Sequence, residues 1–213
     1  MAAGRGRRFG RAKQHQLLAG RPLWLHPARV LDRHPSIDGL VIVTNRPRLA
    51  RVHKLCRTER LGKVIAIVPG GTCRTDSVRA GLAALPDTGL VAVHDAARPL
   101  LDPALLDPGF RLALRYGAAT CGLPVTDTLK SVESGLVTGT LDRAGLFAIQ
   151  TPQFFTLELL HRAHALAARR SLTATDDCAL VESLGIKPAV LPGSPLGTKI
   201  TTPADLELVR KLM

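Results

Sequence analysis

Short apolar runs alternate with amphipathic helical patterns along this chain, and this alternation constrains its fold more than any other feature. The runs are continuous in apolar residues, which is typical of strands buried on both faces of a sheet. We expect strands at residues 39–44, 63–68, 90–94 and 118–123. Strand and helix in alternation predict an α/β fold: a mostly parallel, doubly wound, Rossmann-like sheet with helices on both faces.

Amphipathic helices are expected between these strands. Residues 74–85 place Val78, Leu82 and Leu85 on one helical face, and residues 102–117 form a later helical pattern that proline interrupts. Helices on both sides of the sheet would leave its carboxyl edge open to ligands, because the loops collect there.

Two further helices are expected in the C-terminal third. Residues 157–168 have a helical pattern, on whose exposed side we expect His161 and His164. Thr202, followed by proline and then by Asp205 in the first turn, predicts the start of the last helix.

Residues 125–149 depart from this alternation. They are rich in Thr, Val and Leu, with a turn expected near Glu133-Ser134-Gly135, which predicts a β-hairpin. An isolated two-stranded hairpin is only marginally stable in water, and a connection of this length is unusual in a compact sheet. We therefore expect an arm that projects and packs on a second subunit, giving a homodimer.

Length and composition predict a single domain over residues 1–213, since 46% of the residues are hydrophobic and can fill one sizeable core. The sequence has no long apolar run, so neither a membrane span nor a secretory signal is predicted, and we expect a cytoplasmic protein. The cysteines lack zinc-ligand spacing and are expected to be reduced structural thiols.

The net charge of +12 is concentrated at one end of the chain. Residues 1–60 hold fourteen Arg and Lys residues against three acidic ones, and the rest is nearly balanced. Such a basic end can serve a polyphosphate substrate, bind RNA or form a solvated surface. Only 3% of the residues are aromatic, which disfavours base stacking, so a nucleic-acid partner is not expected.

The first ten residues, MAAGRGRRFG, fit neither of two common phosphate-binding fingerprints. A P-loop requires Gly-Lys followed by Ser or Thr, and a dinucleotide fingerprint would require glycine where Phe9 stands. The glycines let backbone amides approach an anion, and the arginines with Lys13 can neutralise its charge. Taken alone, this signal is weak.

Seven sequence segments together give a stronger signal than any one of them, because they occur in one chain and in a fixed order. They are AAGRGRRFG with KQ shortly after it, GGTCRTDSVRAGL, VHDAARPLL, PVTDTLK, LDRAGLFAIQTPQFF, TDDCALVESLG and TKITTPADL. Over residues 2–212 the chain resembles the 2-C-methyl-D-erythritol 4-phosphate cytidylyltransferases, within the wider class of sugar-phosphate nucleotidyltransferases. The resemblance implies a homodimeric, Mg²⁺-dependent enzyme that joins CTP to 2-C-methyl-D-erythritol 4-phosphate and releases pyrophosphate in the non-mevalonate route to isoprenoids.

The resemblance assigns three catalytic cations to the reacting phosphates. Arg8 matches the family's Gly-loop cation, Lys13 the lysine that follows it, and Lys199 its C-terminal lysine. Positive charge around the α-phosphate would stabilise the charge that builds in the transition state. Judged without the resemblance, Lys199 could equally be an exposed lysine at a strand end.

Asp95 is the predicted metal ligand. It follows an apolar strand, so it should lie where the carboxyl ends of the strands face ligands. A single carboxylate combined with triphosphate oxygens suits Mg²⁺. The family match favours this role over an ion pair with Arg98, which then becomes a substrate-binding cation.

The nucleotide is assigned to backbone groups of the Gly loop and the GG segment, again by the resemblance. The matching residues are Ala2, Ala3, Gly4, Gly6, Gly71, Ser77 and Ala96. Backbone groups and one hydroxyl could distinguish cytosine from larger bases by shape and hydrogen bonding. From its position alone, Ser77 could equally be a first-turn helix residue without a ligand.

Four residues match the family's acceptor site. Thr128 and Arg143 belong to the arm, which in the family reaches the neighbouring subunit, and Arg143 can hold a phosphate through two parallel hydrogen bonds. Thr151 and Thr175 match further acceptor contacts. Thr175 is followed by two aspartates, so a helix N-cap is its alternative role.

The first strand of the family's sheet is missing from this sequence, which begins at the Gly loop. We expect either a sheet without that central strand or a strand that lies outside the sequence. Two other functions remain open: a cytidylyltransferase for another polyol phosphate, such as ribitol 5-phosphate, and a non-catalytic, basic protein that binds nucleotides or RNA.

Overall fold

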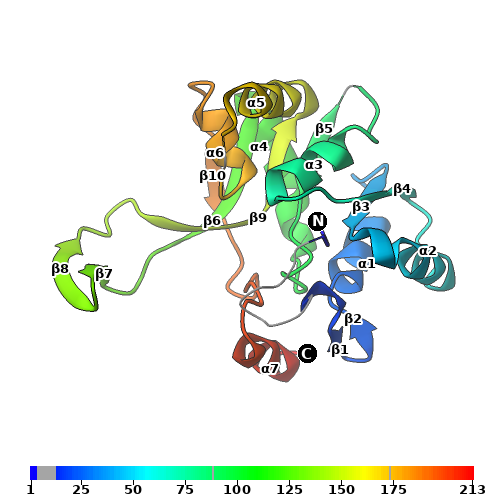
Figure 1. Cartoon of the computed structure of the whole chain (residues 1–213), viewed down its shortest axis with the longest axis horizontal. Helices are drawn as coiled ribbons and strands as arrows, with labels where there is room; N and C mark the ends of the chain where they lie inside the picture. Colours follow the sequence, from blue (N-terminus) through cyan, green and yellow to red (C-terminus); the bar gives the residue numbers. More distant parts are fainter. Residues whose placement is uncertain (4–12, 88, 173) are drawn as a thin grey trace.

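The computed structural model describes residues 1–3, 13–87, 89–172 and 174–213 (Figure 1). Its first half contains η2 (Lys13–His15), β1 (Leu17–Leu18), β2 (Arg21–Pro22), α1 (Leu25–Arg33), β3 (Leu40–Thr44), η3 (Arg46–Arg48), α2 (Leu49–Thr58), β4 (Val64–Pro69), α3 (Arg74–Leu82) and β5 (Leu90–Val93). Its second half contains η4 (Pro103–Leu105), α4 (Leu106–Tyr116), β6 (Ala118–Pro124), β7 (Leu129–Glu133), β8 (Leu136–Leu141), β9 (Phe147–Thr156), α5 (Leu157–Arg170), α6 (Asp177–Glu182), β10 (Ala189–Pro192) and α7 (Pro203–Lys211).

The four predicted strands are confirmed as β3, β4, β5 and β6, with ends that shift by at most one residue. The predicted helices are confirmed as α3, α4, α5 and α7. Helix α7 starts as expected, because the side chain of Thr202 accepts a hydrogen bond from the backbone N–H of Asp205, whose carboxylate accepts one from the backbone of Thr202.

The direction of the strands differs from the prediction of a mostly parallel sheet. Strands β3 and β4 are parallel, as are β10 and β6, but β9 runs antiparallel to both of its neighbours, β6 and β5. The chain leaves the sheet at the end of β6, passes through the arm and returns along β6 as β9, so this pair is antiparallel. Sequence patterning misses β9 because its middle is polar and contains a proline.

Helices cover both faces of the four-stranded sheet β10-β6-β9-β5, as expected. Two neighbouring residues of β9 point to opposite faces, since side chains alternate along a strand. Phe154 packs in a cluster with residues of α4, and Phe155 packs in another with residues of α3, α5 and α6. Both rings are fully buried, so β9 anchors two cores at once.

Residues 1–3 lie between β3 and β5, where the described chain has no strand (Figure 1). The backbone N–H of Ala2 donates to the carbonyl oxygen of Val43 at 2.7 Å, and the amine of Met1 donates to that of His94 at 2.7 Å. The two sheets, β3-β4 and β10-β6-β9-β5, are thus linked by hydrogen bonds to this short segment rather than by a full strand.

The predicted hairpin is confirmed as β7 and β8, which pair antiparallel and project from the body of the molecule (Figure 1). The turn consists of Ser134 and Gly135, both with positive φ, which is typical of the tight turns that join hairpin strands. Every residue of β8 is exposed. The described part of the chain therefore gives this arm no surface to pack on.

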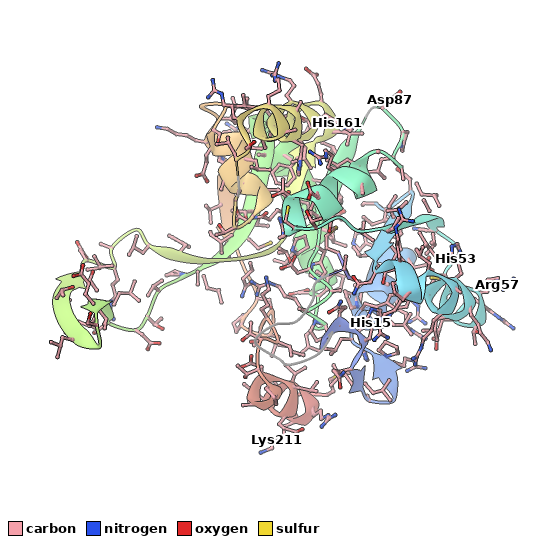
Figure 2. The ribbon with its side chains drawn as sticks, viewed as in Figure 1. His15, His53, Arg57, Asp87, His161 and Lys211 are labelled. Carbon is pink, nitrogen blue, oxygen red and sulfur yellow. The ribbon has the colours of Figure 1, made fainter. Side chains whose placement is uncertain are left out.

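Helix α5 corrects one prediction. His161 is exposed on its outer side (Figure 2), whereas His164 is only 2% exposed and shares the buried face with Leu160 and Ala167. His164 lies four residues after Leu160, so it falls on the same helical face. Among the described residues, no helix is both long enough and apolar enough to cross a membrane.

Candidate active site

The side chains of Asp95, Lys199 and Arg74 meet just beyond the end of β5. The Oδ2 atom of Asp95 accepts a hydrogen bond from Nζ of Lys199 at 2.5 Å, and Oδ1 lies 3.5 Å from Nε of Arg74. Lys199 comes from the segment between β10 and α7, and Arg74 is the first residue of α3. The fold therefore brings two cations to the predicted metal-binding carboxylate.

Asp95 is an anion at neutral pH. Burial opposes its ionisation, because only 8% of the residue is exposed, but the Lys199 ammonium and then the Arg74 guanidinium outweigh burial and hold the pKa of this carboxyl well below its usual value. Its charge is thus available for ligands without deprotonation.

Thr151 fixes the backbone of Asp95. The backbone N–H of Asp95 donates to Oγ1 of Thr151 at 3.1 Å, and this hydroxyl lies 3.2 Å from Nδ1 of His94. Burial lowers the pKa of His94 to about 4, so its ring is neutral at pH 7. The network fits the tautomer in which Nε2–H donates to the carbonyl oxygen of Arg98 and Nδ1 accepts from Thr151.

Arg98 is oriented by backbone carbonyls, and no ion pair joins it to Asp95 within the described ranges. Its Nη1 donates to the carbonyl oxygen of Gly197 at 2.5 Å, and its Nη2 to that of Ile149 at 3.2 Å. The Nε of Arg98 and the Nη2 of Arg74 are buried and have no acceptor among the described residues. A bound anion would satisfy the donor of Arg98, the predicted substrate-binding cation, since buried N–H groups are normally paired.

The described members of the predicted nucleotide site gather around residues 1–3. The carbonyl oxygen of Ala2 accepts from Nε2 of Gln14 at 2.8 Å, and the backbone N–H of Ala96 donates to that of Met1 at 3.1 Å. A Cβ on Gly70 would lie 2.3 Å from the Cβ of Ala3, so only glycine permits this close approach. The Gly-loop start and the GG segment are therefore in contact.

Ser77 supports the turn that leads into α3. Its Oγ accepts a hydrogen bond from the backbone N–H of Gly71 at 3.1 Å and donates to the carbonyl oxygen of Cys73 at 2.8 Å. The residue is buried in the first turn of the helix. Ser77 therefore occupies the first-turn position that was considered as its alternative role. A contact between Ser77 and a nucleotide stays a prediction.

Four of the predicted site residues have no described side chain to place in this site. Gly4, Gly6 and Arg8 fall outside the described residues, as does the side chain of Lys13, whose backbone begins η2. The predicted roles of these four residues stay predictions.

The predicted acceptor residues divide between the body and the arm. Thr151 touches Asp95, whereas Thr128 and Arg143 are exposed on the arm, where Nη1 of Arg143 donates to the carbonyl oxygen of Thr126. Thr175 is exposed, and the N-cap role considered for it is wrong by one position. The side chain of Asp176 caps α6 instead, accepting from the backbone N–H of Ala179.

Sequence reasoning missed three residues behind Asp95. The Nη1 atom of Arg74 lies 2.7 Å from Oδ2 of Asp177, and Oδ1 of Asp177 lies 3.0 Å from Nε2 of His164. Arg74 and Asp177 both lie inside motifs that carry the family resemblance, which was the available signal. His164 could have been found from its four-residue spacing after Leu160.

The donor set fits a magnesium ion that arrives with a nucleotide. In the part of the chain that the structure describes, no three His, Cys, Asp or Glu side chains are grouped so that they could hold a metal ion. Magnesium commonly takes one or two protein carboxylates and completes its shell with phosphate oxygens and water. The single ionised carboxylate of Asp95 matches that pattern.

The comparisons agree with the motifs. The family model described as "IspD: 2-C-methyl-D-erythritol 4-phosphate cytidylyltransferase" matches residues 1–213. The 2-C-methyl-D-erythritol 4-phosphate cytidylyltransferase of Syntrophotalea carbinolica is 42% identical, over 100% of this chain and 93% of the relative. That of Pelotomaculum thermopropionicum is 44% identical, over 100% of this chain and 91% of the relative.

Solved structures with the same fold carry equivalent names. The 2-C-methyl-D-erythritol 4-phosphate cytidylyltransferase of Thermus thermophilus matches with a TM-score of 0.80 and 33% identity, covering 94% of this chain and 93% of that one. The 4-diphosphocytidyl-2C-methyl-D-erythritol synthase of Anaerococcus prevotii matches with a TM-score of 0.85 and 26% identity, covering 99% and 94%. The chain therefore belongs to the 2-C-methyl-D-erythritol 4-phosphate cytidylyltransferase family.

Proposed function

We propose that this chain transfers the cytidylyl group of CTP to 2-C-methyl-D-erythritol 4-phosphate, a step of isoprenoid biosynthesis. An oxygen of the acceptor phosphate attacks the α-phosphorus of CTP, the bond from that phosphorus to its bridging oxygen breaks, and pyrophosphate leaves. The product is 4-diphosphocytidyl-2-C-methyl-D-erythritol. The observation that carries this proposal is the meeting of Asp95 and Lys199 beside residues 1–3 in a member of this family.

The relatives named above give no support to the two other functions. A direct test measures pyrophosphate release from CTP and Mg²⁺ with a panel of polyol phosphates. We expect 2-C-methyl-D-erythritol 4-phosphate to give the highest kcat/KM. A higher value with ribitol 5-phosphate, or RNA binding without any turnover, would contradict the proposal.

Catalysis in this site consists mainly of positioning and charge neutralisation. The acceptor phosphate and the triphosphate repel each other, and cations around the α-phosphorus stabilise the charge that builds there. Lys199 is suited to this role because its side chain is 39% exposed and it can exchange the Asp95 carboxylate for a phosphate oxygen. Arg8 and Lys13 supply the other two cations in this proposal.

Asp95 is the residue that would hold Mg²⁺. When bound, the ion neutralises negative charge on the CTP phosphates. Thr151 supports this role from the backbone side, since it accepts the N–H of Asp95 and so limits the rotation of the metal-binding residue.

The base is held by the turn between β4 and α3 together with the start of the Gly loop. Ala2, Ala3, Gly71 and Ser77 lie around this turn, and the hydrogen bonds of Ser77 keep it in shape. Backbone groups in a rigid turn can select cytosine by hydrogen bonding and exclude a purine by size. Gly4, Gly6 and Ala96 complete the proposed nucleotide site.

The protein forms a homodimer through the arm in this proposal. Val132, Leu136, Val137 and Leu141 are each at least half exposed on β7 and β8, and a second copy would bury them. An arm laid across a two-fold axis brings Arg143 and Thr128 to the partner's Asp95 site. There Arg143 binds the acceptor phosphate, with Arg98, Thr151 and Thr175 contributed by the other chain.

Arg143→Ala is expected to raise the KM for the acceptor by roughly a hundredfold and to change the KM for CTP by less than about threefold, because a phosphate loses a charged, two-pronged donor. Lys130→Ala removes a cation from the same arm that has no assigned role, and it should leave both KM values near those of the parent. Initial rates with each substrate varied in turn provide the measurement.

Coexpression of differently tagged Arg143→Ala and Lys199→Met chains tests whether the arms cross. Each mixed dimer would then have one intact site and one doubly defective site, so random pairing should restore about a quarter of the parent activity. Activity that stays at the level of the separate variants would show that each arm serves its own chain.

A further inference from the structure

Behind Asp95 runs a chain of charged groups that the proposed mechanism does not use. Arg74 lies between two carboxylates, with Nε 3.5 Å from Oδ1 of Asp95 and Nη1 2.7 Å from Oδ2 of Asp177. The Oδ1 atom of Asp177 lies 3.0 Å from Nε2 of His164. Asp177 is fully buried and His164 almost so. One guanidinium therefore connects the site to the interior of the protein.

At the inner end of this row of charged groups, hydrogen bonds hold Asp177 in place. Asp177 is the first residue of α6, and its backbone N–H donates to Oε1 of Gln153 on β9 at 3.2 Å. The Nε2 atom of Gln153 donates to Thr120 on β6 and to Asp176. Asp177 is thus held by α5, β9 and the start of α6, and it holds Arg74 in turn.

At the outer end of this row of charged groups, Asp95 can change one of its partners. Lys199 occupies Oδ2 of Asp95, but the proposed reaction requires Lys199 near the phosphates of CTP. When Lys199 leaves, Oδ2 becomes free for another partner. The other oxygen, Oδ1, faces Arg74, which cannot follow the ligand because Asp177 anchors it.

We propose that Arg74 is a positioning residue, which holds Oδ1 of Asp95 from the buried Asp177–His164 pair so that Oδ2 can change partners while the carboxylate stays in place. This inference rests on the proposed function. It assigns Arg74 no contact with either substrate. Arginine suits the task because its planar fork reaches two carboxylates at once, which a lysine ammonium does less well.

A pair of substitutions tests the proposal without leaving a buried charge unpaired. Arg74→Gln alone would strand the Asp177 carboxylate in the interior, and such a variant could fail to fold. Arg74→Gln combined with Asp177→Asn removes both charges, keeps the size of the side chain at position 177 and shortens the one at position 74. The matched control combines Arg162→Gln with Glu158→Gln, which removes an exposed Arg–carboxylate pair on α5.

The Arg74/Asp177 double variant is expected to lower kcat at least roughly tenfold while changing the KM for CTP and the Mg²⁺ half-saturation by less than about threefold. Loss of positioning acts on the transition state, whereas general damage to the site would also weaken binding. The Arg162/Glu158 control should keep the parent kcat. A kcat within about threefold of the parent, or a loss of binding as large as the loss of kcat, would overturn the proposal.

A thermal double-mutant cycle tests the shared carboxylate without any turnover. Removing the Arg74–Asp177 pair from a Lys199→Met chain takes both cations away from the buried Asp95, so Tm at pH 7 should fall by at least about 5 °C more than the two separate effects together. If the two changes in Tm were additive, Lys199 and Arg74 would not share Asp95, and the proposal would be overturned. Because this cycle needs no substrate, a failure of the cytidylyl-transfer function would be recognised separately, by a parent chain that releases no pyrophosphate.

Discussion

Asp95→Asn is expected to lower kcat by on the order of a thousandfold, because the amide keeps the shape of the side chain but lacks the charge that would hold Mg²⁺ against the triphosphate in the proposed site. Asp95 is the carboxylate at which Lys199 and Arg74 meet. Burial raises the pKa of this carboxyl, but Lys199 and then Arg74 outweigh it and leave the pKa well below the usual value. Pyrophosphate release at saturating CTP and acceptor, with Mg²⁺ varied, measures the loss. Added Mg²⁺ should not restore it.

Asp87→Asn is the control for this change. Asp87 is an exposed aspartate in the loop between α3 and β5 (Figure 2), so its loss should leave kcat within about twofold of the parent. If Asp95→Asn retained more than about a tenth of the parent kcat, the metal assignment would be wrong.

The pH dependence of stability separates charge from shape at the same position. A carboxyl group whose pKa is lowered in the folded state stabilises the fold above its unfolded pKa, near 4, and that contribution is lost as the pH falls below it. The parent should therefore lose more stability between pH 6 and about pH 3 than Asp95→Asn does. Thermal unfolding of the two chains across this range provides the comparison.

Lys199→Met is expected to lower kcat by roughly a hundredfold to a thousandfold, because methionine keeps much of the aliphatic stem and removes the cation that the proposed mechanism places at the reacting phosphates. The same change leaves Asp95 paired with Arg74 alone, so folding should be retained. Single-turnover rates with preformed Mg²⁺–CTP complex separate this effect from nucleotide binding, which should weaken less than the rate.

Lys211→Met removes a lysine at the exposed end of α7 (Figure 2), and it should leave the rate unchanged. A Lys199→Met chain with a rate within about threefold of the parent would place the catalytic positive charge elsewhere, on Arg8 and Lys13.

Local patterns in the sequence predicted most of the secondary structure. Four apolar runs became β3, β4, β5 and β6, and the Ser134-Gly135 turn placed the arm correctly. These features depend on side chains within a few residues of one another, so a short window of sequence contains the information needed. The order of seven motifs likewise predicted the family, which the comparisons confirm.

The site was predicted only in part. Asp95 contacts both Thr151 and Lys199, which were assigned to the same site, but the motifs gave no reason to join Arg74 to Asp177 or to pair His164 with a buried partner. An apolar helix face accepts a histidine only when a buried partner satisfies it, and that partner lies on a different helix. Spacing along one helix cannot supply such a partner.

The sequence by itself determined where β3 to β6, four of the helices and the arm occur and which family the motifs indicate, because periodicity, caps and turns are local properties. Only the tertiary structure decided that β9 runs antiparallel between β6 and β5, and that Lys199 reaches Asp95 from 104 positions away. Strand direction follows the path of the chain through space, and an ion pair over such a separation forms only after the sheet has brought both segments to one edge.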